Sequence, residues 1–250
     1  MSMIGSTTSL HKRDLFSGCK KYSEDDYINN KVFSSEYRIV RISYSEAMDI
    51  VVKNHYMHRT CPCSRAYGLI DSNENIVGVV TYGVPCSSTL LRGVCGDDES
   101  GNVYELNRLW VSEDVPKNGE SFLVGNTLRD LDKEIIVSFS DTSVGHFGFI
   151  YQATNFLYCG LSAKFRDIRV KGKENQHIAT FAHGMTNRQV IDKYGEENVY
   201  FVDRPRKHRY VYFNASKTRK KQLLKKLRYP VLDYPKGNSQ KHSVDETYGY

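Results

Sequence analysis

The residues best suited to chemistry follow a buried strand that the apolar run at 135–137 predicts. Asp141 stands where this strand should end. Gly145 and Gly148 then interrupt the backbone before a segment with helical spacing that carries Tyr151. A carboxylate at the carboxyl end of a strand, opposite a helix with polar side chains, is where open α/β sheets place their chemistry. The pair indicates proton transfer, and the alternative is an aspartate that only caps the next helix.

A second group of candidate residues lies near the expected end of the first helix, where His55 and His58 are separated by three positions and Tyr56 lies between them. This spacing can place both imidazoles on one helical face. Imidazole, phenol and carboxylate together suit a transition metal such as Fe(II). We therefore hypothesise an Fe(II) site formed by His55, Tyr56 and Asp141, with His58 and His146 as further candidates. The alternative is a buried histidine pair whose ring nitrogens bond to the backbone.

Composition limits the class of protein. The chain has 250 residues, 40% of them hydrophobic and 12% aromatic, which suits one large domain or a domain with an extension. No stretch of about 18 apolar residues exists, so we expect no membrane-spanning helix, and the N-terminus lacks the apolar segment of a secretory signal. Of the six cysteines only Cys61 and Cys63 are closely spaced. Because one such pair is a poor zinc signature, we expect free thiols in a reducing cytoplasm.

Charge is distributed unevenly along the chain. The net charge is +6, yet residues 204–228 hold eleven basic residues and no acidic one, so the rest has 24 basic residues against 29 acidic. A basic segment interleaved with aromatic residues favours a polyanion, and affinity carried by such charges falls steeply with salt. The alternative is a solvated tail. The expected nucleic-acid contacts are Lys207, Arg209, Lys217, Arg219, Lys220, Lys221, Lys225 and Lys226.

Hydrophobic periodicity divides the chain into alternating strands and helices. Strands are expected at 37–42, 65–70, 76–82, 103–111, 135–141, 156–161 and 209–213, and helices from 45 onward, at 117–131, at 149–156 and at 187–194. This order predicts an α/β (α+β) fold with a mixed central sheet and helices on both faces. We expect residues 1–35 to form a flexible N-terminal arm, 36–215 the catalytic domain and 216–250 a basic C-terminal extension.

Four segments carry a resemblance to known families: 105–110 (Glu-Leu-Asn-Arg-Leu-Trp), 138–160, 207–213 and 229–236. The order of elements resembles the GNAT acetyltransferase superfamily, and within it these segments resemble the phage Mom-type DNA-modification proteins. The resemblance implies a sheet that opens between its fourth and fifth strands to admit acetyl-CoA or a related acyl donor. A helix N-terminus would hold the pyrophosphate. Its residues would be Lys117, Asn118, Gly119 and Ser121, although the superfamily's usual glycine-rich loop is absent.

The same resemblance implies an activity: conversion of adenine in double-stranded DNA to its N6-carbamoylmethyl derivative, which protects phage DNA from restriction in the host cytoplasm. Because the amine is unreachable inside a duplex, the base should be extruded into the site. Two alternatives stay open, an acetyl-CoA-dependent N-acetyltransferase of a protein or small amine and a non-catalytic DNA-binding anti-restriction protein. The sequence favours neither a monomer nor a dimer.

The resemblance also implies roles for single residues. Asp141 would accept a proton from the adenine amine, and Tyr151 would protonate a departing thiolate. Arg108 would neutralise a substrate anion or orient Asp141, and Ser121 would act at the anion-binding start of its helix.

The adenine edge would be read by the side-chain amide of Asn155 or Gln152, since amides suit the donor and acceptor pattern of adenine. Structural alternatives exist for two of these assignments. Arg108 could form an ion pair with Glu105, and Asn155 could cap its helix.

Overall fold

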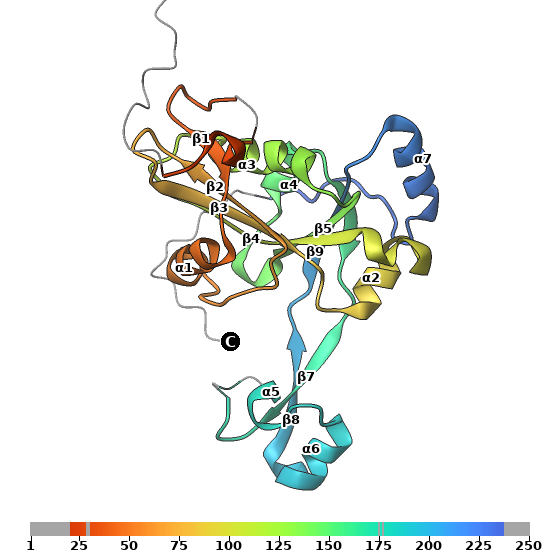
Figure 1. Ribbon diagram of the computed structural model, residues 1–250. Coiled ribbons are helices and arrows are strands. Elements are labelled where there is room, and N and C mark those ends of the chain that lie inside the picture. Colours follow the sequence, from red (N-terminus) through yellow and green to blue (C-terminus); the bar gives the residue numbers. More distant parts are fainter. Residues whose placement is uncertain (1–20, 29–30, 175, 177, 238–250) are drawn as a thin grey trace, which may run out of the picture.

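A seven-stranded mixed sheet forms the centre of the molecule (Figure 1). The computed structural model describes residues 21–28, 31–174, 176 and 178–237. The strand order is β1-β2-β3-β4-β5-β9-β6, and all neighbours are antiparallel except β4 and β5, which run parallel. The strands are β1 (Arg38–Arg41), β2 (Arg65–Ile70), β3 (Ile76–Gly83), β4 (Val103–Val111), β5 (Ile135–Asp141), β6 (Leu157–Leu161) and β9 (Lys207–Phe213).

Helices cover both faces of this sheet. One face, called here the α1 face, carries α1 (Tyr44–Asn54), α2 (Ser88–Cys95) and α7 (Lys217–Lys226), and the opposite α3 face carries α3 (Gly119–Thr127) and α4 (Phe149–Ala153). Side chains alternate accordingly: Ile135 and Val137 of β5 pack in the cluster of α2 and α7, whereas Ile136 packs in the cluster of α3. Short 3-10 helices are η2 (Glu24–Asp26), η3 (Asp97–Asn102), η4 (Leu128–Asp130), η5 (Thr142–Val144) and η6 (Glu196–Asn198).

Local signals explain where the first long helix begins. The Ser43 side chain accepts the backbone N–H of Glu46, and the Glu46 carboxylate accepts the backbone N–H of Ser43, which satisfies two donors at the start of α1. The buried residues of α1, including Ala47 and Val51, then pack on the α1 face of β2 and β3. The helix expected from residue 45 onward is confirmed, but its cap is Ser43 and not Ser45, and its C-cap is His55.

The parallel strands β4 and β5 separate partway along their length. They pair only as far as Leu106 and Ser138, although both strands continue. Asn107 follows at once and is an extra residue in β4, between those that lie opposite Thr81 and Tyr82 of β3. Such a β-bulge bends its strand and increases the local twist. The bulge therefore turns the end of β4 away from β5, at the place where the sheet was expected to open.

Residues 162–206 form a separate arm between β6 and β9. Its two strands, β7 (Phe165–Val170) and β8 (Val199–Arg204), pair as an antiparallel ribbon that projects from the body with α5 (Ile178–Phe181) and α6 (Asn187–Tyr194) (Figure 1). A small core of Ile168, Val170, Ala182 and Val190 holds the ribbon to these helices. The helix expected at 187–194 is confirmed, whereas the ribbon was not expected.

The fold class and the bounds of the strands at 103–111 and 135–141 are confirmed. Tyr22 and Ile28, within the expected N-terminal arm, are buried against the sheet. Residues 1–20, 29–30 and 238–250 of the expected terminal segments lie outside the described residues. In the part of the chain that is described, no helix is long and apolar enough to cross a membrane.

Candidate active site

Ionisable side chains gather on the α1 face where β4 and β5 separate. Glu105 and Arg108 come from β4, Asp141 from the end of β5, and Lys207 from the start of β9. Asp141 lies directly opposite Lys207 in the β5–β9 pair, and Glu105 lies opposite Val137 in the β4–β5 pair. Three neighbouring strands thus bring their charged residues to one edge of the sheet, next to the carboxyl ends of the parallel pair.

The carboxylate of Asp141 is occupied on both oxygens. Oδ1 accepts hydrogen bonds from the backbone N–H (3.0 Å) and the hydroxyl (2.6 Å) of Ser143, and Oδ2 lies 3.1 Å from Nζ of Lys207. Burial raises the pKa of Asp141, but Ser143 and the Lys207 ammonium outweigh burial and hold this pKa below its ordinary value. Asp141 therefore caps η5 and anchors Lys207, and it is a weak proton acceptor.

Glu105 has the opposite environment. Its half-buried carboxylate has no hydrogen bond and no ion pair within the described residues, and burial raises the pKa of Glu105 although Arg108 and Lys207 lower it in part. The pKa values of the two carboxylates around Lys207 are thus shifted in opposite directions. This arrangement suits Glu105 as a proton acceptor and keeps Asp141 as an anion. The sequence interpretation considered Glu105 only as a partner of Arg108.

Arg108 extends across the bulge without a carboxylate partner. It donates from one amino group to the backbone oxygen of Asn107 (2.6 Å) and from the other to that of Thr60 (3.5 Å), whereas its Nε is buried with no partner. The alternative ion pair with Glu105 does not form, because no carboxylate of the described residues lies within 4 Å of Arg108. A buried, unused donor in a polar site is suited to an oxygen of a bound substrate.

Tyr151 approaches the same opening from the α3 face. Its ring lies 5.0 Å from that of Tyr210 and 5.3 Å from that of Phe156. Burial raises the pKa of Tyr151, a hydrogen bond with Ser138 lowers it, and the charge of Glu105 raises it further. The phenol therefore keeps its proton at neutral pH. Gly148 allows α4 to pack this closely on Tyr210, because its φ is 69° and a Cβ atom at this residue would lie 2.5 Å from the Tyr210 ring.

Two residues of the Fe(II) hypothesis lie side by side, since the rings of His55 and Tyr56 stack with their centroids 4.5 Å apart. Nδ1 of the buried His55 accepts the backbone N–H of Met57 (3.1 Å), so the neutral ring carries its proton on Nε2, and burial lowers the pKa of His55 to about 3. Nδ1 of His58 lies 2.9 Å from a backbone oxygen, and His146 packs edge-on against Tyr56. Among the described residues, no group of three or more histidine, cysteine or acidic side chains could hold a metal. The hypothesised set of His55, Tyr56 and Asp141 includes a phenol and stays a prediction.

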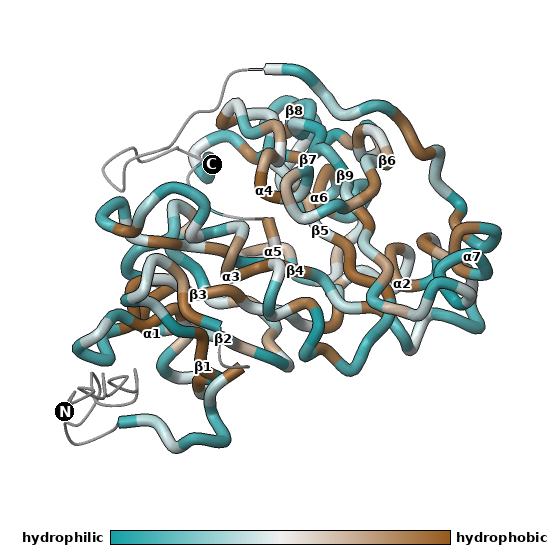
Figure 2. Tube along the Cα trace, turned by 90° about the horizontal axis from the view of Figure 1, so that it is seen from above, coloured by the Kyte–Doolittle hydropathy of each residue, from teal (hydrophilic) through white to brown (hydrophobic). Residues whose placement is uncertain are grey.

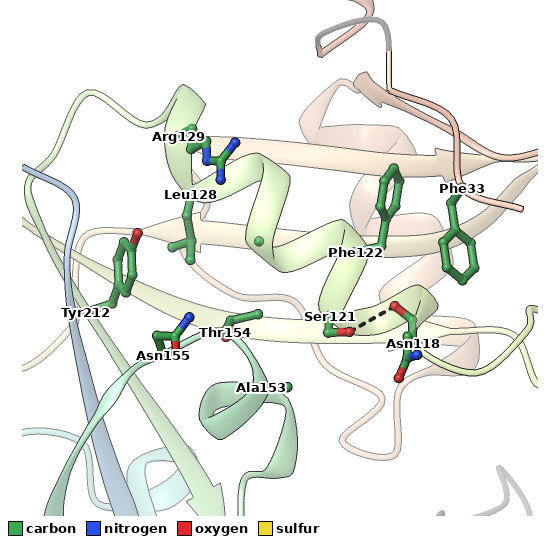
Figure 3. Close-up of a pocket in the computed structure, with 11 residues that line it drawn as sticks. Phe33, Asn118, Ser121, Phe122, Leu128, Arg129, Ala153, Thr154, Asn155 and Tyr212 are labelled. Carbon is green, nitrogen blue, oxygen red and sulfur yellow. Dashed lines mark hydrogen bonds between the residues drawn. The ribbon is translucent and has the colours of Figure 1, made fainter.

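A groove of about 340 Å³ lies between α3 and α4 on the α3 face (Figure 3). Two of the expected cofactor residues, Asn118 and Ser121, line its end at the start of α3, where the Ser121 hydroxyl donates to the Asn118 backbone oxygen (3.0 Å). Lys117 is exposed and is not a lining residue, and Gly119 is buried against Val115. Ser121 therefore belongs to this groove and is separated by the sheet from the ionisable cluster.

The two residues expected to read adenine also lie on the α3 face. Asn155 lines the far end of the groove and follows α4 in a left-handed conformation (φ 62°), as asparagine often does after a helix, which favours the capping alternative. Gln152 donates from its side-chain amide to the backbone oxygen of Phe147 (3.0 Å). Neither amide is placed beside Glu105 or Asp141.

The basic block is divided among several environments. Arg219 pairs with Glu99 and Glu134, and Lys226 with Asp98 and Glu99. The guanidinium of Arg209 stacks 3.8 Å from the ring centroid of Tyr229, and Lys207 pairs with Asp141. Five of the expected contacts have no ion pair in the described part of the chain: Arg209 on β9, and Lys217, Lys220, Lys221 and Lys225 on α7.

Comparison with known proteins shows the family to which this chain belongs. The sequence model of the Mom protein family matches residues 36–236. The chain belongs to the Mom protein family. The "Methylcarbamoylase mom" of Escherichia phage Mu is 29% identical over 216 residues, which are 81% of this chain and 85% of the phage Mu protein.

Solved structures similar to this Mom-family chain are acetyltransferases. An N-acetyltransferase from Staphylococcus aureus Mu50 is 10% identical and covers 72% of this chain and 99% of its own, with a TM-score of 0.41. An acetyltransferase from Salmonella typhimurium, solved with acetyl-CoA, is 10% identical and covers 72% of this chain and 95% of its own, with a TM-score of 0.40.

The site described above lies entirely inside the segment that matches the Mom family. Glu105, Arg108, Asp141, Tyr151 and Lys207 all fall within residues 36–236. Four of the five were candidates from sequence, and Glu105 was not. The signal in the sequence was the Glu-Leu-Asn-Arg motif, in which Glu105 stands three positions before Arg108. In the structure the two residues form no ion pair.

Proposed function

We infer that this chain is a DNA-modification transferase that converts adenine in double-stranded DNA to N6-carbamoylmethyl adenine. Membership of the Mom family and similarity to the methylcarbamoylase of phage Mu support the class of reaction. The observation that carries the proposal is the placement of a proton acceptor, Glu105, and a proton donor, Tyr151, at one opening in the sheet. In a phage-infected cell this modification protects the DNA from host restriction enzymes.

The two faces of the sheet have different roles in this proposal. The extruded adenine enters from the α1 face, where Glu105, Arg108 and the Asp141–Lys207 pair lie. As the N6 nitrogen forms its bond to the transferred group, the proton that nitrogen loses passes to Glu105. Tyr151 gives its proton to the departing group from the other face. The unused Nε–H of Arg108 binds an oxygen of the substrate.

The donor occupies the α3 face. Asn118 and Ser121 lie at the start of α3, whose first N–H groups have no helical partner and suit a phosphate, so these residues fit the diphosphate of a CoA-type donor. Simple acyl transfer would join N6 to a carbonyl carbon, so the donor would have to present a carbamoylmethyl group whose CH2 carbon the N6 nitrogen attacks as the bond from that carbon to the departing group breaks. Asp141 acts as a positioning residue, because its charge holds Lys207 beside Glu105.

The test is the mass of the nucleosides in plasmid DNA from cells that express this chain. We expect an adenine nucleoside that is heavier by one carbamoylmethyl group and that is absent from cells carrying an empty vector. An unchanged nucleoside pool in cells that contain the folded protein contradicts the proposal. Acetylation of a protein or small amine without DNA would instead support the acetyltransferase alternative.

A further inference from the structure

Two segments of the chain, and not one, concentrate positive charge. Besides residues 204–228, residues 164–173 contain five basic residues and one acidic residue, and they form β7 and the turn after it. Together the two segments hold 16 of the 35 basic residues and one of the 29 acidic residues, so the rest of the chain has 19 basic residues against 28 acidic. A DNA-binding surface must therefore include one of these segments or both.

The basic helix α7 lies at the wrong end of the sheet for the site. Lys207, at the start of β9, pairs with Asp141, whereas Phe213, at the end of β9, lies opposite Ile135 at the start of β5. Six steps along a strand span about 20 Å, and α7 begins beyond Phe213, next to α2 (Figures 1 and 2). A duplex held by α7 would not present an extruded base directly to Glu105.

The β7–β8 arm, by contrast, is attached at the site. The Ser162 backbone N–H donates to the Lys207 backbone oxygen (2.8 Å), and the Arg206 guanidinium donates to the Ser162 backbone oxygen (2.6 Å). The hydroxyl of Thr142, in the 3-10 helix that Asp141 caps, donates to the Arg206 backbone oxygen. These bonds tie the root of the arm to the residues beside the ionisable cluster, so a ligand along the arm passes the opening.

The shape of the arm suits a groove of DNA. Six residue pairs give the ribbon a length of about 20 Å, and the major groove admits a two-stranded ribbon. One face of the ribbon packs Ile168 and Val170 on α5 and α6. The other face leaves Phe165 58% exposed and Val202 44% exposed. Apolar side chains at these positions are free to contact base edges.

The arm also provides positive charges that no carboxylate of the described residues neutralises, although Lys173 lies over the Phe181 ring and Arg169 donates to the Glu174 backbone oxygen. Arg204 pairs with Asp167, and Arg166 with Asp203. The basic residues of the arm's first segment without an ion pair in the described part of the chain are Lys164, Arg169, Lys171 and Lys173. The arm thus carries as many such charges as α7, from Lys164 at its root to Lys171 and Lys173 beyond the far end of β7. Because only the arm is attached at the site, its attachment and not its charge distinguishes the two surfaces.

We propose that the β7–β8 arm, residues 162–206, is the surface that binds duplex DNA and places the target adenine at the opening between β4 and β5. The inference rests on the DNA substrate of the proposed function, and it adds which part of the chain holds that substrate. The α7 lysines then make at most outer contacts, and the ion pairs of Arg219 and Lys226 attach α7 to η3.

The test compares two variants of equal charge. One replaces Lys164, Arg169, Lys171 and Lys173 by Gln, and the other replaces Lys217, Lys220, Lys221 and Lys225 by Gln. Binding of a fluorescently labelled duplex is measured by anisotropy across a salt series, without any donor. Because each phosphate contact contributes about 0.9 to the slope of log affinity against log salt, we expect the arm variant to lose about 2–3 of slope and at least about tenfold in affinity.

The α7 variant should lose far less on both measures. An equal loss in both variants, a larger loss in the α7 variant, or no binding by the unchanged chain overturns the inference. Thermal unfolding checks that both variants fold, and a milder variant changing only the exposed Lys164 and Lys171 serves if the fourfold arm variant does not. Nucleoside masses separate this inference from the proposed function. If DNA binding depends on the arm but no modified adenine is found, the proposed function is contradicted and the inference about the arm stands.

Discussion

Replacing Glu105 by Gln separates catalysis from stability more cleanly than any other change in the site. The side chain of Glu105 has no hydrogen bond and no ion pair in the described residues, so its neutral amide leaves no partner without a bond. Burial of the charge is unfavourable, as the raised pKa of Glu105 indicates. The stability of Glu105→Gln should therefore equal or slightly exceed that of the unchanged chain at neutral pH, with a change within about 0.5 kcal/mol.

The rate should change far more. A positioned general base contributes about 10²- to 10⁴-fold, which corresponds to about 3–5 kcal/mol in the transition state. The assay is the initial rate of modified adenine formation in duplex DNA, by nucleoside mass. The matched control is Glu113→Gln, the same chemical change on the exposed loop after β4, which should keep the full rate.

The neighbouring carboxylate should respond in the opposite way. Asp141→Asn keeps an oxygen that can cap η5 but removes the charge that pairs with the partly exposed Lys207, so it should cost about 1–2 kcal/mol and lower Tm by roughly 2–8 °C. A Glu105→Gln variant that modifies DNA at the normal rate would refute the assignment of the base. A Glu105→Gln variant as unstable as Asp141→Asn would refute the reasoning about its environment.

Further predictions concern the phenol, the acid limb of the rate, the glycine turn and the α7 ion pairs. Tyr151→Phe should remove most modification while lowering stability by only about 1 kcal/mol, the worth of its hydrogen bond with Ser138, as read from nucleoside mass and Tm. Because Glu105 must be ionised to accept a proton and its pKa lies above 4.5, the rate of the unchanged chain should fall on acidification at a pH where an exposed glutamate is still charged; a rate that stays flat there contradicts the assignment. Gly148→Ala should destabilise by about 1–3 kcal/mol and reduce activity, since its φ is 69° and its Cβ would meet Tyr210; an unchanged Tm would contradict the packing. Hydrogen bonds from Arg219, and then from Lys226, lower the pKa of Glu99 to about 2. The stability that this carboxylate contributes is therefore fully present above about pH 4.5 and is lost as the pH falls toward 2. Glu99→Gln should lower Tm at pH 7 and reduce the loss of Tm on acidification.

The sheet could be predicted from sequence because its strands are local apolar runs. The strands at 103–111 and 135–141 are apolar segments bounded by turn residues, and their bounds agree with the structure. The β7–β8 ribbon was missed because its strand Phe-Arg-Asp-Ile-Arg-Val does not alternate cleanly: two charged residues separate Phe165 from Ile168, and only Ile168 and Val170 are buried. A small core of this kind gives a weak periodic signal.

Most residues of the candidate site could be named from sequence, but the different environments of its two carboxylates could not. Asp141 was found because it ends a strand, yet its partner Lys207 comes from a distant part of the chain, and only the fold brings the two together. Glu105 was missed because its environment depends on the bulge at Asn107, which sequence patterns do not reveal. The Fe(II) hypothesis stays a prediction: the backbone N–H of Met57 occupies Nδ1 of His55, so Nε2 is the ring nitrogen left for a metal.

The most direct test of the site is a crystal structure of the Tyr151→Phe variant bound to a short duplex that contains the target adenine. The proposed chemistry predicts an extruded adenine on the α1 face, with its N6 nitrogen about 2.6–3.2 Å from the carboxylate of Glu105. An adenine that lies instead in the groove of Asn118, Ser121 and Asn155, or one that stays stacked in the duplex beside this opening, would contradict it.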